Sequence, residues 1–276
     1  MNKKFMRFPK GKAKVVTFSY DDCVEEDQRL IDLLKKYGMK GTFNLIPGWF
    51  AEEGTVYPEG ETYRLVTEGM AKKMYDTKEV EVSNHGDCHK FMTSLSTAEM
   101  ADDMLACRKK LEALFGRNIR GMAYPYGWYN EELEKVLAMC GIVYSRTVCS
   151  TYEFELPDNW LEWHPTCHHD ADELMDLAEE FVRMKPQDTP KLFYVWGHTF
   201  EFERNDNWDV IEEFMKKVSG KDDIWYATNM EIYEYVKAYE SLDISADGRR
   251  IVNPSKIPVW VEIDGTLYEI KDELVL

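Results

Sequence analysis

Short runs of apolar, β-branched and aromatic residues recur along the chain, and a stretch with helical spacing of apolar positions follows each run. The first run, Val15 to Phe18, leads into a segment in which Leu30, Leu33 and Leu34 share one helical face. This alternation is typical of βα units. The predicted strands cover residues 14–19, 41–45, 79–84, 121–124, 142–148, 192–196 and 224–227.

The predicted helices carry end signals that agree with this alternation. Gly38 ends the first helix, and Ser96 with Glu99 forms a capping box at the start of the third. Asn130 and Asn229 are suitable N-caps for later helices. The helices are expected at residues 26–37, 63–75, 96–116, 130–141, 170–185, 208–218 and 229–239.

The repeated βα units favour a parallel barrel over an open sheet. We therefore predict an α/β fold, a parallel barrel of seven βα units, over residues 1–242. The remainder differs in kind, because residues 259–263 and 266–270 flank Asp264-Gly265, which is a strong signal for a tight β-hairpin. Residues 243–276 are expected to form a small β extension.

Composition limits the function classes. The 276 residues are 44% hydrophobic and 13% aromatic, which is enough for a substantial core. With 51 acidic and 34 basic residues, the net charge of −17 argues against nucleic-acid and anionic-membrane partners, since both need a basic surface. A neutral or cationic substrate is favoured, and the oligomeric state is left open.

The expected location is the cytoplasm. No apolar region of a signal peptide follows the basic start of the sequence, and no apolar stretch is long enough for a membrane span. The 6 cysteines are scattered without a C-x-x-C pair. We expect them to be reduced thiols.

Polar residues that could catalyse a reaction or bind a metal gather where the predicted strands end. They are Asp21 and Asp22 after the first strand, His85 and His89 after the third, Tyr124 to Gly127 after the fourth, Arg146 late in the fifth, and His198 after the sixth. Because α/β barrels place active sites at the carboxyl ends of their strands, we expect these side chains to converge.

His85 and His89 have the H-x-x-x-H spacing that can direct two imidazoles at one ion. One carboxylate of the Asp21-Asp22 pair could complete a His₂-carboxylate site, and the other could accept a proton from a water activated by the ion. Two surface histidines, and an acidic pair at a helix start, are the alternative interpretations. His198 is expected to be a general acid, with a core histidine as the alternative.

These motifs, in this order, resemble those of the polysaccharide deacetylases, the NodB-homology group or carbohydrate esterase family 4. The matching segments are Thr17-Phe18-Ser19-Tyr20-Asp21-Asp22, His85-x-x-x-His89, Tyr124-Pro125-Tyr126-Gly127 and Trp196-Gly197-His198, within residues 14–240. The resemblance implies a distorted (β/α)7 barrel.

The resemblance also implies roles for individual residues. Asp21 would be the general base, and Asp22, His85 and His89 would bind one divalent ion, usually Zn²⁺ and sometimes Co²⁺ or Mn²⁺. The backbone N–H of Tyr126 would stabilise the oxyanion, and His198 would protonate the departing amine.

The sequence departs from the family pattern at several positions. Cys23 stands where a glycine is usual, and Ala123 stands where an arginine usually orients the base. Arg146 or Arg120 could replace that arginine, and Arg146 is the one predicted at the carboxyl ends of the strands. The family's aspartate–tryptophan motif has no clear counterpart, and residues 163–169 lie in its place.

The expected function is removal of an N-acyl group, most simply acetyl, from an amino sugar or oligosaccharide. Arg146, Trp128 and His164 are the candidate substrate contacts; His168 and His169 could shape the pocket, bind a second metal or belong to a polar loop. Hydrolysis of another small amide, such as a cyclic ureide, is the enzymatic alternative. A carbohydrate-binding protein without catalysis is the alternative from another class.

Overall fold

The computed structural model describes residues 3–276, and its centre is a curled parallel sheet. The strands follow one another in space in the order β6-β5-β4-β3-β2-β8-β7. They are β2 (Lys14–Asp21), β3 (Gly41–Leu45), β4 (Val80–Asn84), β5 (Gly121–Ala123), β6 (Tyr144–Arg146), β7 (Cys167–His168) and β8 (Lys191–Gly197).

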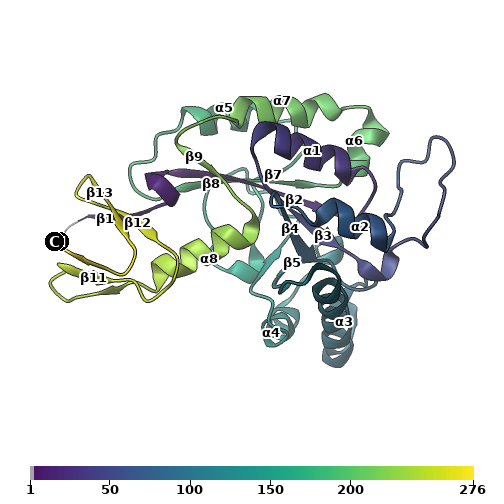
Figure 1. Cartoon of the computed structure of the whole chain (residues 1–276), viewed down its shortest axis with the longest axis horizontal. Helices are drawn as coiled ribbons and strands as arrows, with labels where there is room; N and C mark the ends of the chain where they lie inside the picture. The colour runs from purple at the N-terminus through teal and green to yellow at the C-terminus, as the bar shows by residue number, and fades with distance from the viewer. Residues whose placement is uncertain (1–2) are drawn as a thin grey trace.

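Helices cover the outside of this sheet. They are α1 (Asp27–Tyr37), α2 (Glu68–Tyr75), α3 (Thr97–Phe115), α4 (Glu131–Met139), α5 (Leu174–Arg183), α6 (Thr199–Asn205), α7 (Trp208–Val218) and α8 (Asn229–Glu240). Figure 1 shows α1, α5 and α7 along one side of the sheet and α3 and α4 on the opposite side. Every residue of β2 is buried, because helices pack on the outer face of the sheet and side chains of the other strands fill the barrel interior.

The segment before β7 brings the two edges of the sheet together. The N–H of Trp163 donates to the carbonyl of Ser145 at 3.0 Å, and the N–H of Thr147 donates to the carbonyl of Trp163 at 3.1 Å. Three residues later, the N–H of Thr166 donates to the carbonyl of Tyr194 in β8 at 2.9 Å. The predicted distorted (β/α)7 barrel is confirmed within residues 3–276.

Some predicted element boundaries are wrong. The helix expected at 63–75 begins only at Glu68, with Thr67 as its cap. The residues before it are extended, because Leu65 forms an antiparallel β-bridge with Val24 and the N–H of Val66 donates to the carbonyl of Cys23. The strand expected at 142–148 is limited to β6, and the helix expected at 170–185 begins at Leu174.

Two strands have positions that the sequence pattern did not predict. The short strand β7 was missed, because Cys167-His168 has no apolar run. The last predicted strand exists as β9 (Ile224–Tyr226), but it pairs with the first residues of β2.

The C-terminal residues form two small antiparallel sheets. The hairpin of β12 (Val259–Ile263) and β13 (Thr266–Ile270) is confirmed, and Asp264 and Gly265 both have the positive φ of its predicted turn. Its outer partner is β1 (Lys4–Arg7), from the other end of the chain. The second sheet contains β10 (Asp243–Ile244), β11 (Arg250–Val252) and β14 (Glu273–Val275). A domain boundary at residue 242 stays a prediction.

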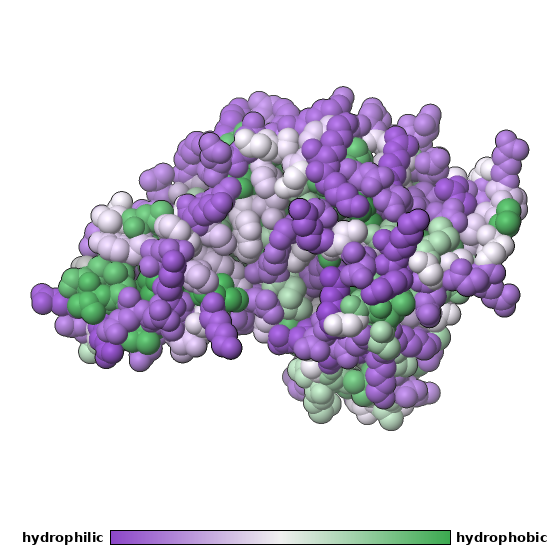
Figure 2. All heavy atoms as spheres, in the orientation of Figure 1, coloured by the Kyte–Doolittle hydropathy of each residue, from purple (hydrophilic) through white to green (hydrophobic). Residues whose placement is uncertain are grey.

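The face of the molecule in Figure 2 is largely hydrophilic, with a hydrophobic group of atoms over the C-terminal sheets. Among residues 3–276, no helix is both long enough and apolar enough to cross a membrane.

Candidate active site

The predicted site residues meet at the carboxyl ends of the parallel strands. Asp21 ends β2, Arg146 ends β6, and His198 directly follows β8. His85 follows β4 and lies 3.7 Å from Asp21, measured between Nε2 and Oδ2. Residues separated by more than 170 positions therefore share one site, as the strand order requires.

Asp22, His85 and His89 direct three donor atoms at a common point. The Nε2 atoms of His85 and His89 are 3.2 Å apart, and they lie 3.8 and 4.0 Å from Oδ1 of Asp22. Ligands of a tetrahedral zinc ion are about 3.3 Å from one another, given bonds of about 2.0–2.1 Å. Oδ1 of Asp22 is buried and has no hydrogen-bond partner within residues 3–276, so the group fits an ion.

His85 and His89 are neutral imidazoles, the form of histidine that binds a metal ion. Nδ1 of His85 lies 2.8 Å from the carbonyl of Ala123, which requires the proton on Nδ1 and leaves the Nε2 lone pair free. Burial lowers the pKa of His85, and burial together with His85 lowers the pKa of His89 to about 4. Both rings are therefore neutral at pH 7.

Several residues of the site have left-handed backbone conformations. The φ angles are 83° at Asp22, 53° at Cys23, 49° at His89 and 58° at Tyr126. Residues other than glycine adopt this region at a cost in free energy, and such strain gathers at functional sites. The positive φ at Cys23 gives a physical reason why a glycine would suit that position.

Asp21 is held by two neighbours. Asn44 donates from Nδ2 to Oδ1 at 2.8 Å, and the buried guanidinium of Arg146 donates from Nη2 to Oδ2. Although burial raises the pKa of Asp21, Arg146, His85 and His198 together lower it to about 2. The carboxylate is therefore ionised and oriented over the physiological pH range.

The arginine beside Asp21 is Arg146 and not Arg120, whose nearest acidic partner is Glu234 at 3.9 Å. Arg146 also stacks over the ring of Trp196, with its guanidinium carbon 4.4 Å from the ring centroid. Its burial and its contact with Asp21 favour a role in orienting that carboxylate. Asn44 was missed, although a polar residue inside the apolar run 41–45 was the available signal.

His198 lies between Asp21 and Glu201. Its Nε2 is 3.9 Å from Oδ2 of Asp21, and its Nδ1 is 3.1 Å from Oε2 of Glu201. Burial lowers the pKa of His198, but Glu201, Asp21 and Asp22 outweigh burial and raise it to about 9. The ring is therefore protonated at neutral pH and can donate a proton.

Tyr126 lies beside the group of Asp22, His85 and His89, and Trp128 follows two residues later in the chain. Tyr126 is in η4 (Pro125–Gly127), with its ring 4.3 Å from that of His89 and stacked on Phe91 at 3.8 Å. Trp128 is 64% exposed, so its ring is available to a ligand.

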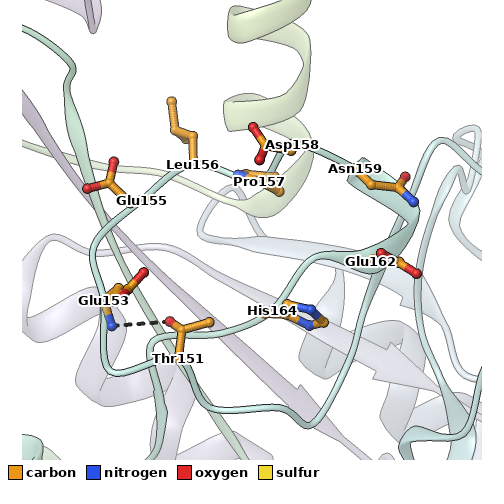
Figure 3. A pocket seen from close by; sticks show the side chains of 9 residues that line it. All are labelled: Thr151, Glu153, Glu155, Leu156, Pro157, Asp158, Asn159, Glu162 and His164. Atoms are coloured by element: carbon orange, nitrogen blue, oxygen red, sulfur yellow. Dashed lines mark hydrogen bonds between the residues drawn. The ribbon is translucent and has the colours of Figure 1, made fainter.

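His164 lies in a separate pocket of about 310 Å³, formed by the loop after β6 (Figure 3). Its Nδ1 contacts Oγ1 of Thr147 at 2.6 Å, and Thr147 follows Arg146 in the chain. The side chains that line the pocket are those of Thr151, Glu153, Glu155, Leu156, Pro157, Asp158, Asn159, Glu162 and His164, so it does not include the metal group. A contact between His164 and the substrate stays a prediction.

Tyr63 is a further site residue that the sequence pattern did not reveal, because it was assigned to a helix. It belongs instead to the loop that projects between β3 and α2 in Figure 1. Its ring packs edge-on against Phe200 at 4.9 Å, and burial and then the nearby Asp22 carboxylate raise the pKa of its hydroxyl.

Asp27, at the start of α1, gives the stability a distinctive pH dependence. Its carboxyl accepts hydrogen bonds of 2.5 Å from the hydroxyls of Tyr75 and Thr199, and burial raises its pKa from 3.8 to about 7. The folded state therefore binds a proton that the unfolded state releases at lower pH. Raising the pH from 4 to above 7 should reduce the unfolding free energy by up to about 4 kcal/mol through this group.

Asp27→Asn should be free of that loss. Urea denaturation at pH 5 and pH 8 should show the variant gaining stability relative to the wild type at the higher pH. Asp32→Asn, on the exposed face of α1, serves as the control. An equal difference between wild type and Asp27→Asn at both pH values would contradict a raised pKa.

Comparison with known proteins agrees with this geometry. Residues 9–145 match the family model of the polysaccharide deacetylases. A candidate polysaccharide deacetylase from Mycobacterium smegmatis superposes with a TM-score of 0.60 at 19% identity, over 86% of this chain and 94% of the other.

A second structure of similar fold is the carbohydrate esterase family 4 domain of a xylanase from the hindgut metagenome of Trinervitermes trinervoides. It has a TM-score of 0.54 and 14% identity, over 82% of this chain and 92% of that domain. A search of curated protein sequences gave no match. The matched residues 9–145 contain the aspartate pair, the H-x-x-x-H motif and the Tyr124–Gly127 segment, and this part of the chain belongs to the polysaccharide deacetylase family.

Proposed function

We propose that this protein is a metal-dependent hydrolase that removes an N-acetyl group from an amino sugar or a short oligosaccharide. The observation that carries the proposal is the position of Asp21. It lies beside the group of Asp22, His85 and His89, is held ionised by Arg146, and has no place among the three converging donor atoms. An oriented free carboxylate next to an ion site suits a general base.

Asp22, His85 and His89 would hold one divalent ion, with zinc expected from two imidazoles and one carboxylate. When bound, the ion would polarise the acyl carbonyl and acidify an attacking water. The acidified water matters for Asp21 as a base, because a carboxylate with a pKa of about 2 accepts a proton only from an acidified donor.

The remaining steps belong to residues of the chain. Asp21 accepts the proton as the water oxygen attacks the acyl carbon. The backbone N–H of Tyr126 donates to the developing oxyanion. His198 then gives its Nε2 proton to the amine nitrogen as the C–N bond breaks, which releases acetate and the free amine, while Glu201 stabilises the cationic ring.

The substrate class follows from family and charge. The net charge of −17 disfavours anionic saccharides and suits neutral N-acetylated sugars and amine products. Tyr126, beside His89, and the exposed Trp128, two residues further along the chain, offer faces on which a sugar ring could stack. A location in the cytoplasm would favour a small saccharide over a polymeric wall.

The test combines metal content with product release. Protein loaded with zinc, cobalt or manganese should release acetate from N-acetylated oligosaccharides, and chelation should stop the reaction until the ion is restored. His85→Gln should lose the activity and the ion held by Asp22, His85 and His89. The proposal fails if the loaded protein releases no acyl group from a broad panel of N-acetylated sugars.

A further inference from the structure

A second group of histidines surrounds Glu201, on the side of His198 that faces away from Asp21. Its members are His168 at the end of β7, His169 directly after it, and His198 at the start of α6. Half of the 6 histidines of the chain are therefore gathered around one carboxylate. The proposed acid–base chemistry needs only one of the three.

The three imidazoles approach the same oxygen. Oε2 of Glu201 lies 3.1 Å from Nδ1 of His198, 3.2 Å from Nε2 of His168 and 3.4 Å from Nε2 of His169. The donor atoms of His168, His198 and Glu201 all lie within 4.8 Å of one another. The distances from Oε2 of Glu201 to the three imidazole nitrogens are close to the separation of about 3.3 Å expected between two ligand atoms of a tetrahedral zinc ion.

His169 adds an independent observation. Its side chain is fully buried, and neither ring nitrogen has a hydrogen-bond partner within residues 3–276. The backbone of β8 fixes the ring, because a Cβ atom at Gly197 would lie 2.0 Å from its Nδ1. A buried imidazole without a partner is costly unless its site also receives a ligand.

We propose that His168, His198 and Glu201 form a second site for a zinc-like divalent ion, with His169 beside it as a further imidazole donor. Two or three imidazoles with one carboxylate are a ligand set that suits zinc. His198 would link the two sites, since its Nε2 faces Asp21 and its Nδ1 faces Glu201.

An ion at this second site should inhibit the hydrolase, a consequence that rests on the proposed function. Coordination through Nδ1 replaces the proton that His198 otherwise directs at Glu201. The ring is then a neutral imidazole whose Nε2–H is a much weaker acid than an imidazolium. Departure of the amine would lose its proton donor.

Zinc titration against a competing chromophoric chelator tests the site itself. Wild-type protein should bind two zinc ions per chain, and His168→Gln should bind one, because the amide can still donate to Glu201 but has no imidazole lone pair. His85→Gln/His89→Gln should also bind one ion, and adding His168→Gln to it should abolish binding. Circular dichroism shows whether each variant is folded.

His164→Gln is the matched control, since this histidine lies in the loop just before β7 and in neither group, and the variant should still bind two ions. The proposal is overturned if the wild type binds one ion and His85→Gln/His89→Gln binds none. That result would make Glu201 only the centre of an ion-paired histidine cluster. It is also overturned if His168→Gln still binds two ions.

The inhibitory effect has its own readout. Acetate release at one and at several equivalents of zinc should fall for the wild type, while the ratio of the two rates should be close to unity for His168→Gln. A protein that binds two ions but releases no acetate at either level would disprove the proposed function and leave the second site established.

Discussion

Asp21→Asn is expected to lower the rate of acetate release by about a hundred- to ten-thousandfold, the usual contribution of a positioned general base. An amide has the size of the carboxyl group and can still accept the hydrogen bond from Asn44, but it cannot take a proton from water. Metal content should stay unchanged, because Asp21 lies outside the group of Asp22, His85 and His89. Steady-state kinetics and metal analysis measure the two effects on the same sample.

The comparison variant is Asp206→Asn, an exposed position at the end of α6 with a φ of 50°, which asparagine tolerates well. It should keep wild-type turnover. If Asp21→Asn retained full activity with a full complement of metal, Asp21 would not be the base.

Arg146→Leu is expected to lower the unfolding free energy of the metal-free protein by about 3–5 kcal/mol, the usual cost of leaving one charge of a buried pair without its partner. Arg146 is fully buried, and Asp21 is 3% exposed. Urea denaturation measures the loss. Arg120→Leu is the matched control, because its ion pair with Glu234 is half exposed and should contribute less than about 1 kcal/mol.

The pH dependence separates this cause from simple loss of packing. In the wild type the pKa of Asp21 is lowered to about 2, so its stabilising contribution is present above pH 4 and is lost as the pH falls toward 2. Without Arg146, burial dominates and raises the pKa of Asp21. The deficit of Arg146→Leu should therefore be larger at pH 7 than at pH 3, and Asp21→Asn/Arg146→Leu should recover part of it. A deficit independent of pH would contradict the ion-pair explanation.

The barrel could be predicted because its determinants are local in the sequence. The strands that end at Asp21, Asn84 and Gly197 are buried along nearly their whole length, and such strands alternate with amphipathic helices. The hairpin at Asp264-Gly265 could be predicted for the same reason, since its turn geometry depends on two adjacent residues. Strand β7 could not, because its pairing with β8 comes from tertiary position.

The sequence by itself determined the kinds of chemical group and the edge of the sheet where they gather. The order of Asp21, His85 and His198 along the chain, each after an apolar strand, placed them at one end of a parallel barrel. Their pairing was decided only by the tertiary structure. Arg146 was selected over Arg120, Asn44 was added to Asp21, and Glu201 was placed against three histidines, because such contacts depend on the curvature of the sheet and on side-chain packing across it.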